Sequence, residues 1–362
     1  MILILGAGSI GKRHLSNLAA LGERAFAVAD PREDRLNEAK ERAQAAAGKE
    51  PLEWVPLKTQ REAFDKKLPL KAVVIATPPR HHPEAIRAAL EIKCPIFCEK
   101  PVACDDEDWG ALAALAEKAG RDNTFTMVAY NYRFNAQLQQ VRRILREGNI
   151  GKVLSIRGTF SENLREWHPA EGLNFYMSSL RQGGGALLDE SHLIDLCRWL
   201  FGDIAEVHGF NGTVSSLKED PVFETDDLVE IVARFESGAI GSLHMDLFGK
   251  YHQKRVEAIG EEGTLIWNFD NTDIEANGIQ VWKGKRTQLT PETTRRVPEE
   301  VICSDGFLRN RMYLEEARYF LDSLKAGRHL RDDVPDLQDG LKTMEVIRAV
   351  RQRCAAKETV RA

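Results

Sequence analysis

A glycine-rich turn at the start of the chain constrains the fold more than any other feature. Residues 1–5 are apolar throughout, and residues 6–11 follow at once with the pattern GxGxxG before a helical pattern begins. In such a turn Gly6 permits a tight bend, Gly8 lets the backbone approach a pyrophosphate, and Gly11 lets the helix pack closely on the strand. The N–H groups of the first helical turn face the phosphates. This order of strand, turn and helix predicts a parallel α/β fold that binds a dinucleotide.

Asp30 supports this interpretation and bears on the choice of cofactor. It ends the next apolar run, over residues 25–29, at about the 20-residue spacing at which a carboxylate binds the adenosine ribose. A carboxylate there repels a 2′-phosphate, so we expect NAD. Arg32 follows closely and can pair with such a phosphate, which keeps NADP as the alternative.

Two later apolar runs extend the pattern of alternating strands and helices that is typical of βαβ units. They are followed by Thr77-Pro78 and by Glu99-Lys100. Ligands of open α/β sheets bind at the carboxyl ends of the strands, so both dipeptides should face the cofactor. The residues expected to hold the cofactor are Gly6, Gly8, Ser9, Ile10, Gly11, Asp30, Arg32, Thr77, Pro78, Glu99 and Lys100.

Beyond about residue 150 the short apolar runs give way to longer runs of alternating polar and apolar residues, typical of an antiparallel sheet. The expected strands cover residues 152–160, 206–213, 227–235, 239–247, 253–259 and 264–269. The predicted fold class is α/β, with a Rossmann domain over residues 1–125. An α+β domain with a large, mostly antiparallel open sheet is predicted over residues 126–362, and its last helix can pack back on the first domain. Residues 271–305 suggest no function.

Composition excludes several classes of partner. The 362 residues carry a net charge of -5 without a basic tail, so no nucleic-acid partner is expected. No run approaches the ~20 apolar residues of a membrane helix, and we expect a cytoplasmic protein that binds a small molecule. The six cysteines include no CxxC pair. His81 and His82 stand without nearby carboxylate or cysteine ligands, so we interpret them as loop-packing residues and expect no metal.

Lys100 and a segment near His192 are the candidates for chemistry. Lys100 follows a strand at the edge where the cofactor binds, and its ammonium group can stabilise the charge that develops on a hydroxyl oxygen as hydride leaves. Three glycines precede a predicted helix in which Asp189, His192 and Asp195 share one face. A histidine flanked by carboxylates can exchange protons near neutral pH. The alternatives are an ordinary Lys-Pro turn and an acidic first turn that only complements the helix dipole.

Together these segments resemble the Gfo/Idh/MocA family of NAD(P)-dependent sugar and polyol dehydrogenases. The matching pieces are the glycine-rich turn with Arg13-His14 after it, the tripeptide Glu99-Lys100-Pro101, and residues 130–134 and 183–195. They occur in the family's order over nearly the whole chain. The resemblance implies a Rossmann domain followed by an α+β domain whose open sheet is often used for oligomer contacts. We therefore expect a homo-oligomer, a dimer or tetramer, formed through the C-terminal sheet.

The resemblance also implies roles for single residues. Lys100 corresponds to the family's catalytic lysine, and His192 to the proton carrier, oriented by Asp189 or Asp195. Many members place an aspartate four residues before the histidine, whereas Asp189 lies three before it. Which of the two acids orients His192 therefore stays open.

Further residues are expected to contact the substrate. Asn131 and Arg133 fall where the family places its domain junction, and Arg133 can hold a substrate anion or brace the two domains, of which we favour bracing. Trp167 and Tyr176 precede the three glycines and can bind a sugar, although aromatic residues in loops often serve packing. The expected substrate-binding residues are Lys100, Asn131, Arg133, Trp167, Tyr176 and His192.

The function that these features predict is hydride transfer between a nicotinamide and a hydroxyl or carbonyl group of a sugar, polyol or sugar derivative. Lys100 would stabilise the oxyanion and His192 would remove the hydroxyl proton. Three alternatives remain. The substrate can be a nucleotide-linked sugar of surface-polysaccharide biosynthesis or a non-sugar carbonyl. The chain can also be a non-catalytic nicotinamide or sugar sensor, which Lys100 and His192 disfavour.

Overall fold

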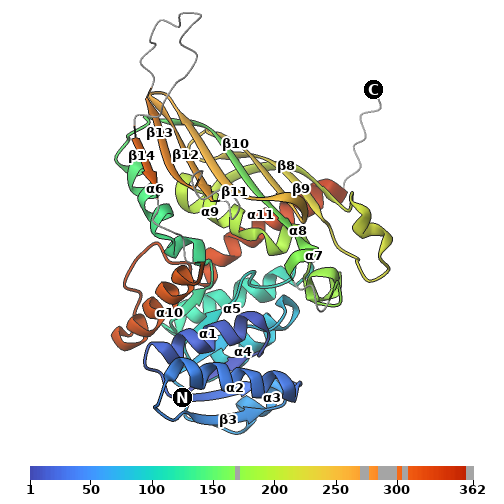
Figure 1. The fold of residues 1–362 in the computed structure, drawn as a ribbon, viewed down its shortest axis with the longest axis vertical. Helices are drawn as coiled ribbons and strands as arrows, with labels where there is room; N and C mark the ends of the chain where they lie inside the picture. The colour runs from blue at the N-terminus through green and yellow to red at the C-terminus, as the bar shows by residue number, and fades with distance from the viewer. Residues whose placement is uncertain (168–171, 270–276, 284–299, 304–308, 356–362) are drawn as a thin grey trace, which may run out of the picture. The chain divides into compact units, whose positions relative to one another are not determined.

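The computed structural model describes residues 1–362 except 168–171, 270–276, 284–299, 304–308 and 356–362 (Figure 1). The chain forms two compact units, which are described separately. Unit 1 consists of Met1–Phe134, Arg181–Gly183 and Arg309–Met344. Unit 2 consists of Asn135–Leu180, Gly184–Leu308 and Glu345–Ala362.

Unit 1 contains a six-stranded parallel sheet in the order β3-β2-β1-β4-β5-β6, which confirms the predicted Rossmann topology. Its strands are β1 (Ile2–Leu5), β2 (Ala25–Ala29), β3 (Glu53–Leu57), β4 (Ala72–Ile75), β5 (Ile96–Cys98) and β6 (Thr126–Val128). The central strands are buried along their whole length, as expected for a parallel sheet covered on both faces. All carboxyl ends meet at one edge of this sheet.

Helices from both ends of the chain cover this sheet. They are α1 (Ser9–Ala20), α2 (Glu33–Ala47), α3 (Gln60–Asp65), α4 (His82–Glu91), α5 (Trp109–Arg121) and α10 (Arg309–Ala326), with the short 3₁₀ turns η1 (Pro79–His81) and η2 (Asn131–Phe134). Helix α10 packs against α1 and η2, although it lies some 300 residues from α1 in the chain (Figure 1). Phe320 of α10 contacts Phe97 of β5, with ring centroids 5.0 Å apart.

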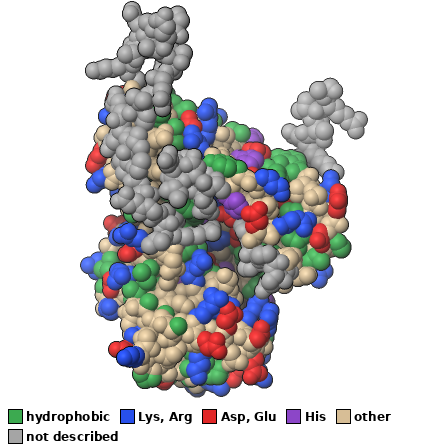
Figure 2. All heavy atoms as spheres, in the orientation of Figure 1, with side chains coloured by type: hydrophobic (Ala, Val, Ile, Leu, Met, Phe, Trp, Pro, Cys, Tyr) green, Lys and Arg blue, Asp and Glu red, His purple; other side chains and the backbone are tan. Residues whose placement is uncertain are grey.

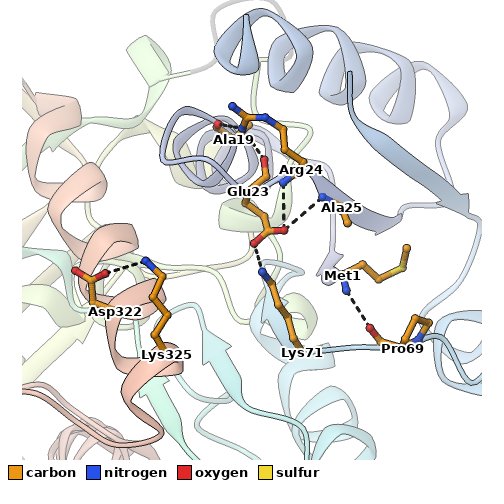
Figure 3. Close-up of polar contacts among 9 residues, drawn as sticks. All are labelled: Met1, Ala19, Glu23, Arg24, Ala25, Pro69, Lys71, Asp322 and Lys325. Carbon is orange, nitrogen blue, oxygen red and sulfur yellow. Dashed lines mark hydrogen bonds and ion pairs between the residues drawn. The ribbon is translucent and has the colours of Figure 1, made fainter. Parts of the chain in front are cut away.

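Polar contacts join residues near the amino ends of the strands, opposite the edge where their carboxyl ends lie (Figure 3). The N-terminal ammonium group of Met1 donates to the carbonyl oxygen of Pro69 at 2.9 Å. The Glu23 carboxylate accepts the backbone N–H of Arg24 at 3.1 Å and pairs with Lys71. These contacts hold together the chain segments that lead into β1, β2 and β4.

Unit 2 is built on an eight-stranded sheet in the order β14-β13-β12-β11-β7-β10-β9-β8. The strands are β7 (Val153–Asn163), β8 (Ile204–Gly212), β9 (Leu228–Phe235), β10 (Ile240–Asp246), β11 (Phe248–Gly260), β12 (Gly263–Phe269), β13 (Gly278–Lys283) and β14 (Glu300–Cys303). Every neighbouring pair is antiparallel except β7 and β10. The predicted, mostly antiparallel sheet is thus confirmed.

One face of this sheet carries helices. The helices and 3₁₀ turns of the second half are α6 (Ala136–Arg146), α7 (Leu164–Trp167), η3 (Tyr176–Ser178), η4 (Leu180–Gln182), α8 (Ala186–Asp189), α9 (Ser191–Phe201), η5 (Ser216–Glu219) and α11 (Leu337–Ala355). Helix α9 packs on β7, and α6 packs on β12, where the indole N–H of Trp267 donates to the buried amide oxygen of Gln137 at 2.9 Å. The alternating burial of β9 reflects this one-sided covering.

The division into residues 1–125 and 126–362 remains a prediction. The compact units differ from it because the end of β6 is bonded to a later part of the chain: the N–H of Val128 donates to the carbonyl oxygen of Pro335 at 2.8 Å. Within residues 271–305 the structure describes Asn277, β13 and β14, and the remaining positions lie outside the described residues.

Two surface properties agree with the composition. On the face drawn in Figure 2, basic and acidic side chains are interspersed, in keeping with the net charge of -5. Among the described residues, no helix is both long and apolar enough to cross a membrane.

Candidate active site

The glycine-rich turn leads into α1 without any side chain that caps the helix. Gly8 precedes α1 in an extended conformation, and the first turn of α1 contains no acidic residue. The first N–H groups of a helix have no acceptor within the helix, and the helix dipole makes this end positive. Ser9, exposed, and Ile10, partly buried, are the first residues of α1. The turn therefore offers backbone donors to an anion.

The three glycines of the turn have different surroundings. A Cβ atom on Gly6, whose φ is +92°, would lie 2.6 Å from the carbonyl oxygen of Ala76 and 3.0 Å from the nitrogen of Thr77. A Cβ atom on Gly11 would lie 2.0 Å from the carbonyl oxygen of Gly6. A Cβ atom on Gly8 would meet nothing within 4 Å. The outer glycines are thus required by packing, whereas the middle one leaves open space in which a pyrophosphate fits.

Asp30 is bonded to the glycine-rich turn. Asp30 is 5% exposed, and its carboxylate accepts the N–H of Ala7 at 2.8 Å and the N–H of Arg32 at 2.9 Å. The exposed guanidinium group of Arg32 pairs with Asp34 at 2.5 Å, and this hydrogen bond lowers the pKa of Asp34. Arg32 is therefore engaged by an acid next to it, which supports NAD rather than NADP.

His82 joins the loops that follow β4 and β5. It is fully buried, with Nε2 2.8 Å from the carbonyl oxygen of Thr77 and Nδ1 2.8 Å from that of Pro101. Burial lowers the pKa of His82. The side chain thus packs between Thr77-Pro78 and the turn that carries Lys100, in agreement with the interpretation of a loop-packing residue.

The backbone of Lys100 is hydrogen-bonded to the side chain of a buried acid, Glu99. The peptide bond between Lys100 and Pro101 is cis, and the Lys100 side chain is partly buried. The Glu99 side chain is buried, and its Oε2 accepts the backbone N–H of Lys100 at 3.2 Å. Its Oε1 lies 2.5 Å from Nε2 of His14, which is fully buried in α1. The two motif segments, Arg13-His14 and Glu99-Lys100-Pro101, are therefore brought together by one hydrogen bond.

Asn131 and Arg133 are both buried in η2, within unit 1. The guanidinium group of Arg133 donates to the carbonyl oxygen of Asp333 at 2.9 Å and to the carboxylate of Asp339 at 2.7 Å. These bonds connect η2 to a segment some 200 residues later in the chain. These bonds lie within unit 1, so whether Arg133 braces the two domains or holds a substrate anion stays a prediction.

In unit 2, Asp226 holds the start of α8. The carboxylate of Asp226 accepts the N–H of Leu187 at 2.8 Å, and its carbonyl oxygen accepts the N–H of Ala186 at 2.9 Å. Arg351 donates to the same carboxylate at 2.6 Å, while burial raises the pKa of Asp226. A Cβ atom on Gly185, whose φ is +104°, would lie 2.6 Å from this carboxylate. The glycine before α8 is thus required by the close approach of Asp226.

The helix predicted through Asp189, His192 and Asp195 is interrupted. Helix α8 ends at Asp189, α9 begins at Ser191, and Glu190 lies between them with φ -84° and ψ 17°. His192, partly buried, and Asp195, 1% exposed, share α9. The carboxylate of Asp189 accepts the hydroxyl of Tyr176 at 2.6 Å. The shared helical face therefore applies to His192 and Asp195 only, and which acid orients His192 stays a prediction.

Glu190, between the two helices, is held by a buried lysine that the sequence analysis missed. The ammonium group of Lys254 lies 3.3 Å from Glu190 and 2.7 Å from Glu162, and 4.3 Å from the ring centre of Phe160. All three charged side chains are less than 10% exposed. The signal that could have revealed it is a lysine at a position of β11 that shares the buried face with Val256 and Ala258.

Trp167 ends α7, and its side chain lies outside the described residues. The predicted cofactor residues Gly6–Gly11, Asp30, Thr77 and Glu99-Lys100 all belong to unit 1, as do Asn131 and Arg133. Tyr176 and the acid and histidine positions of α8 and α9 belong to unit 2.

Comparison with known families accounts for most of the chain. Residues 1–127 match the model of an oxidoreductase family with an NAD-binding Rossmann fold. Residues 138–266 match the model of the GFO/IDH/MocA C-terminal domain. The two matches fall on the parallel and the mostly antiparallel sheet, respectively.

Individual relatives are named for reactions of cyclic sugars and polyols. Levoglucosan dehydrogenase of Pseudarthrobacter phenanthrenivorans is 31% identical over 229 residues, which are 56% of this chain and only 57% of that protein. Myo-inositol 2-dehydrogenase of Thermotoga maritima is 26% identical over 332 residues, covering 90% of this chain and 88% of that protein.

Solved structures share the fold over nearly the whole length. A levoglucosan dehydrogenase in complex with NADH has a TM-score of 0.80 at 23% identity and covers 98% of this chain and 96% of its own. The WlbA dehydrogenase from Bordetella pertussis, in complex with NADH and UDP-GlcNAcA, has a TM-score of 0.73 at 21% identity, with the same coverage. At these identities the likeness extends to the fold.

Proposed function

The chain belongs to the Gfo/Idh/MocA family of NAD-dependent oxidoreductases, and from this we propose that it oxidises a secondary hydroxyl group of a cyclic sugar, polyol or sugar derivative. The observation that carries the proposal is the position of Lys100. It follows β5 at the edge of the sheet where the glycine-rich turn and Asp30 also lie, within one unit. A cation at this edge is suited to stabilise an alkoxide beside a bound nicotinamide.

The reaction removes two hydrogens from the substrate. The carbon–hydrogen bond breaks with its electron pair, for which NAD⁺ supplies the acceptor. The oxygen–hydrogen bond loses a proton, and a carbon–oxygen double bond forms. Lys100 donates a hydrogen bond to the hydroxyl oxygen and stabilises the negative charge that develops there. His192 accepts the proton, and Asp189 or Asp195 stabilises the resulting imidazolium group.

Two observations support a sugar-like substrate. Two of the relatives are named for levoglucosan and myo-inositol, both polyhydroxylated rings. In this chain Tyr176, bonded to Asp189, presents an aromatic ring beside a carboxylate, the combination that stacks on a sugar ring and binds its hydroxyl groups. Asn131, Arg133 and Trp167 remain predicted substrate contacts.

A nucleotide-linked sugar is the second candidate substrate. The similarity in fold to a dehydrogenase solved with UDP-GlcNAcA supports it. A non-sugar carbonyl compound is the third candidate substrate. A substrate panel separates the three.

The test of the proposal is the absorbance of reduced nicotinamide with cyclic polyols, anhydrosugars, sugar acids and nucleotide sugars, using NAD⁺ and NADP⁺ separately. We expect turnover with NAD⁺ and one class of ring polyol. Lys100→Met should lower kcat by on the order of 100- to 1,000-fold, because a charge that stabilises the oxyanion is lost. Lys40→Met, on the exposed side of α2, is the matched control. Normal turnover by Lys100→Met would contradict the assignment.

The joint action of Lys100 and His192 is tested by a double-mutant cycle. His192→Ala should lower kcat by roughly 100- to 10,000-fold while the affinity for NADH, measured by fluorescence, stays within about twofold. If both residues act on one hydroxyl group, the effects of Lys100→Met and His192→Ala on kcat are not additive. Additive losses would show that the two residues act in separate steps.

A further inference from the structure

A carboxyl group lies in the core of unit 1 that the proposed reaction does not use. Glu316 of α10 is fully buried, and within the described residues neither of its oxygens has a hydrogen-bond partner. Its neighbours on the same face of α10 are Tyr313 and Phe320, whose rings pack against His14 and Phe97 at centroid distances of 6.4 Å and 5.0 Å. Glu316 therefore points at the place where α1 meets the end of β5.

Only one of the two ring nitrogens of His14 has a hydrogen-bond partner among the described residues. Its Nε2 bonds Glu99 at 2.5 Å, whereas its Nδ1 is buried without a hydrogen-bond partner among the described residues. A neutral imidazole has one N–H donor and one acceptor nitrogen, and the partner of one nitrogen decides which nitrogen carries the proton. Two buried groups without partners, Nδ1 of His14 and the carboxyl group of Glu316, thus occur in the same small volume.

The surroundings of Glu316 determine which protonation state it favours. Burial is the main cause, and the Glu99 carboxylate the second, that raise the pKa of Glu316 well above its usual range. Helices α1 and η2, which pack against α10, also carry Lys12, Arg13 and Arg133. Lys12 pairs with Glu38, the guanidinium group of Arg13 lies 4.4 Å from the ring centre of Tyr313, and Arg133 is bonded to Asp339. The neutral form of Glu316, which carries an O–H donor, is accordingly favoured.

We propose that Glu316 is a positioning residue, which acts on Lys100 through His14 and Glu99. Its O–H group donates to Nδ1 of His14 through one buried water molecule. The imidazole proton is then held on Nε2, where it donates to the Glu99 carboxylate. This fixes the carboxylate beneath the backbone N–H of Lys100 and places a negative charge next to the lysine. This inference rests on the proposed function, in which Lys100 stabilises the oxyanion.

A positioning role for Glu316 predicts which nitrogen of His14 carries the proton, whereas a role in packing alone predicts nothing about it. If the donor at Nδ1 is removed, the ring can move its proton to Nδ1, and the lone pair of Nε2 then faces the Glu99 carboxylate. Glu316→Leu removes the donor, while Glu316→Gln replaces it with an amide N–H of similar size. Ser323→Ala alters another fully buried polar side chain on α10 and is the matched control.

The first experiment is ¹⁵N NMR of histidine-labelled protein without cofactor, with the His14 signals assigned by their absence in His14→Gln. We expect the Nε2–H tautomer in the wild type, in Glu316→Gln and in Ser323→Ala, and a mixture with the Nδ1–H form in Glu316→Leu. A doubly protonated ring in the wild type would overturn the proposal, because Nδ1 would then be a donor. An unchanged tautomer in a folded Glu316→Leu protein would overturn it as well.

The second experiment measures turnover and its pH profile with the substrate found by the panel. Glu316→Leu should lower kcat by about 10- to 100-fold with little change in the affinity for NADH, and should displace the pH profile. Glu316→Gln should recover most of this loss, and Ser323→Ala should show none. Equal losses in the Leu and Gln variants would contradict a neutral donor. A wild type without turnover on any substrate would refute the proposed function, while the NMR experiment still decides the role of Glu316.

Discussion

At the scale of single residues, Glu316 links protonation to stability. In an unfolded chain a glutamate titrates near 4.5, and in the folded protein burial raises the pKa of Glu316. Between these two values the folded state binds more protons, so its contribution to stability decreases as the pH rises above about 4.5. Glu316→Gln removes this dependence. We expect its advantage in unfolding free energy over the wild type to grow by about 1.4 kcal/mol per pH unit.

Urea unfolding at several values between pH 5 and pH 8 measures this advantage. Ser323→Ala again serves as the control, since it should shift stability equally at each pH. A difference between Glu316→Gln and the wild type that is independent of pH would mean that Glu316 keeps the same charge in both states.

The sequence singled out some residues of interest and missed others, because only some of them carry a local signal. The glycine-rich turn, Asp30 and Glu99-Lys100 were recognisable because local order and spacing carry their signal. Glu316 and Lys254 look like ordinary charged residues of a helix and a strand, and their importance follows from burial beside segments far away in the chain. His82 stood between these cases, because a lone histidine after a strand indicates packing but not which loops it joins.

At the scale of elements, the buried cluster of Lys254, Glu162 and Glu190 holds the junction of α8 and α9. Lys254→Met leaves two carboxylates buried without their cation. We expect this to lower the unfolding free energy by about 3–5 kcal/mol. Because Glu190 lies between Asp189 and the start of α9, kcat should decrease as well. Circular dichroism during urea unfolding and the nicotinamide assay measure the two effects.

Arg255→Met is the matched control for this change. Arg255 is the next residue of β11, points to the other face of the sheet and pairs with Glu257 at 3.0 Å near the surface. Its loss should cost no more than about 1 kcal/mol. Adding Glu190→Gln to Lys254→Met should recover part of the stability, since one uncompensated charge is removed. Equal effects of Lys254→Met and Arg255→Met would show that the buried cluster has no special role.

Two elements show why local patterns are incomplete. Strand β3 (Glu53–Leu57) is absent from the expected strands, and it contains Pro56, which is tolerated because β3 lies at the edge of the sheet. The break at Glu190 was not expected either, since no glycine or proline marks it. In both cases pairing with distant residues decides the local conformation.

At the scale of the whole molecule, the chain passes repeatedly between its two units. Arg181–Gly183 and Arg309–Met344 belong to unit 1 although unit 2 residues precede and follow them. The fold class could be predicted because the change from short buried runs to alternating runs is visible in the sequence. The return of α10 could not, because an amphipathic helix gives no sign of which sheet it will cover.

The last prediction concerns assembly through unit 2. Helices α6 and α9 pack on one face of its sheet, whereas the other face carries Val232 and Ile240, 53% and 43% exposed, on the adjacent strands β9 and β10. Burial of exposed apolar side chains favours association. We therefore expect a homo-oligomer formed through this face.

Val232→Lys combined with Ile240→Lys places two cations there and should yield monomers in light scattering coupled to size-exclusion chromatography. Leu330→Lys, equally exposed in unit 1, should leave the assembly unchanged. An oligomer that survives the double change would place the interface elsewhere.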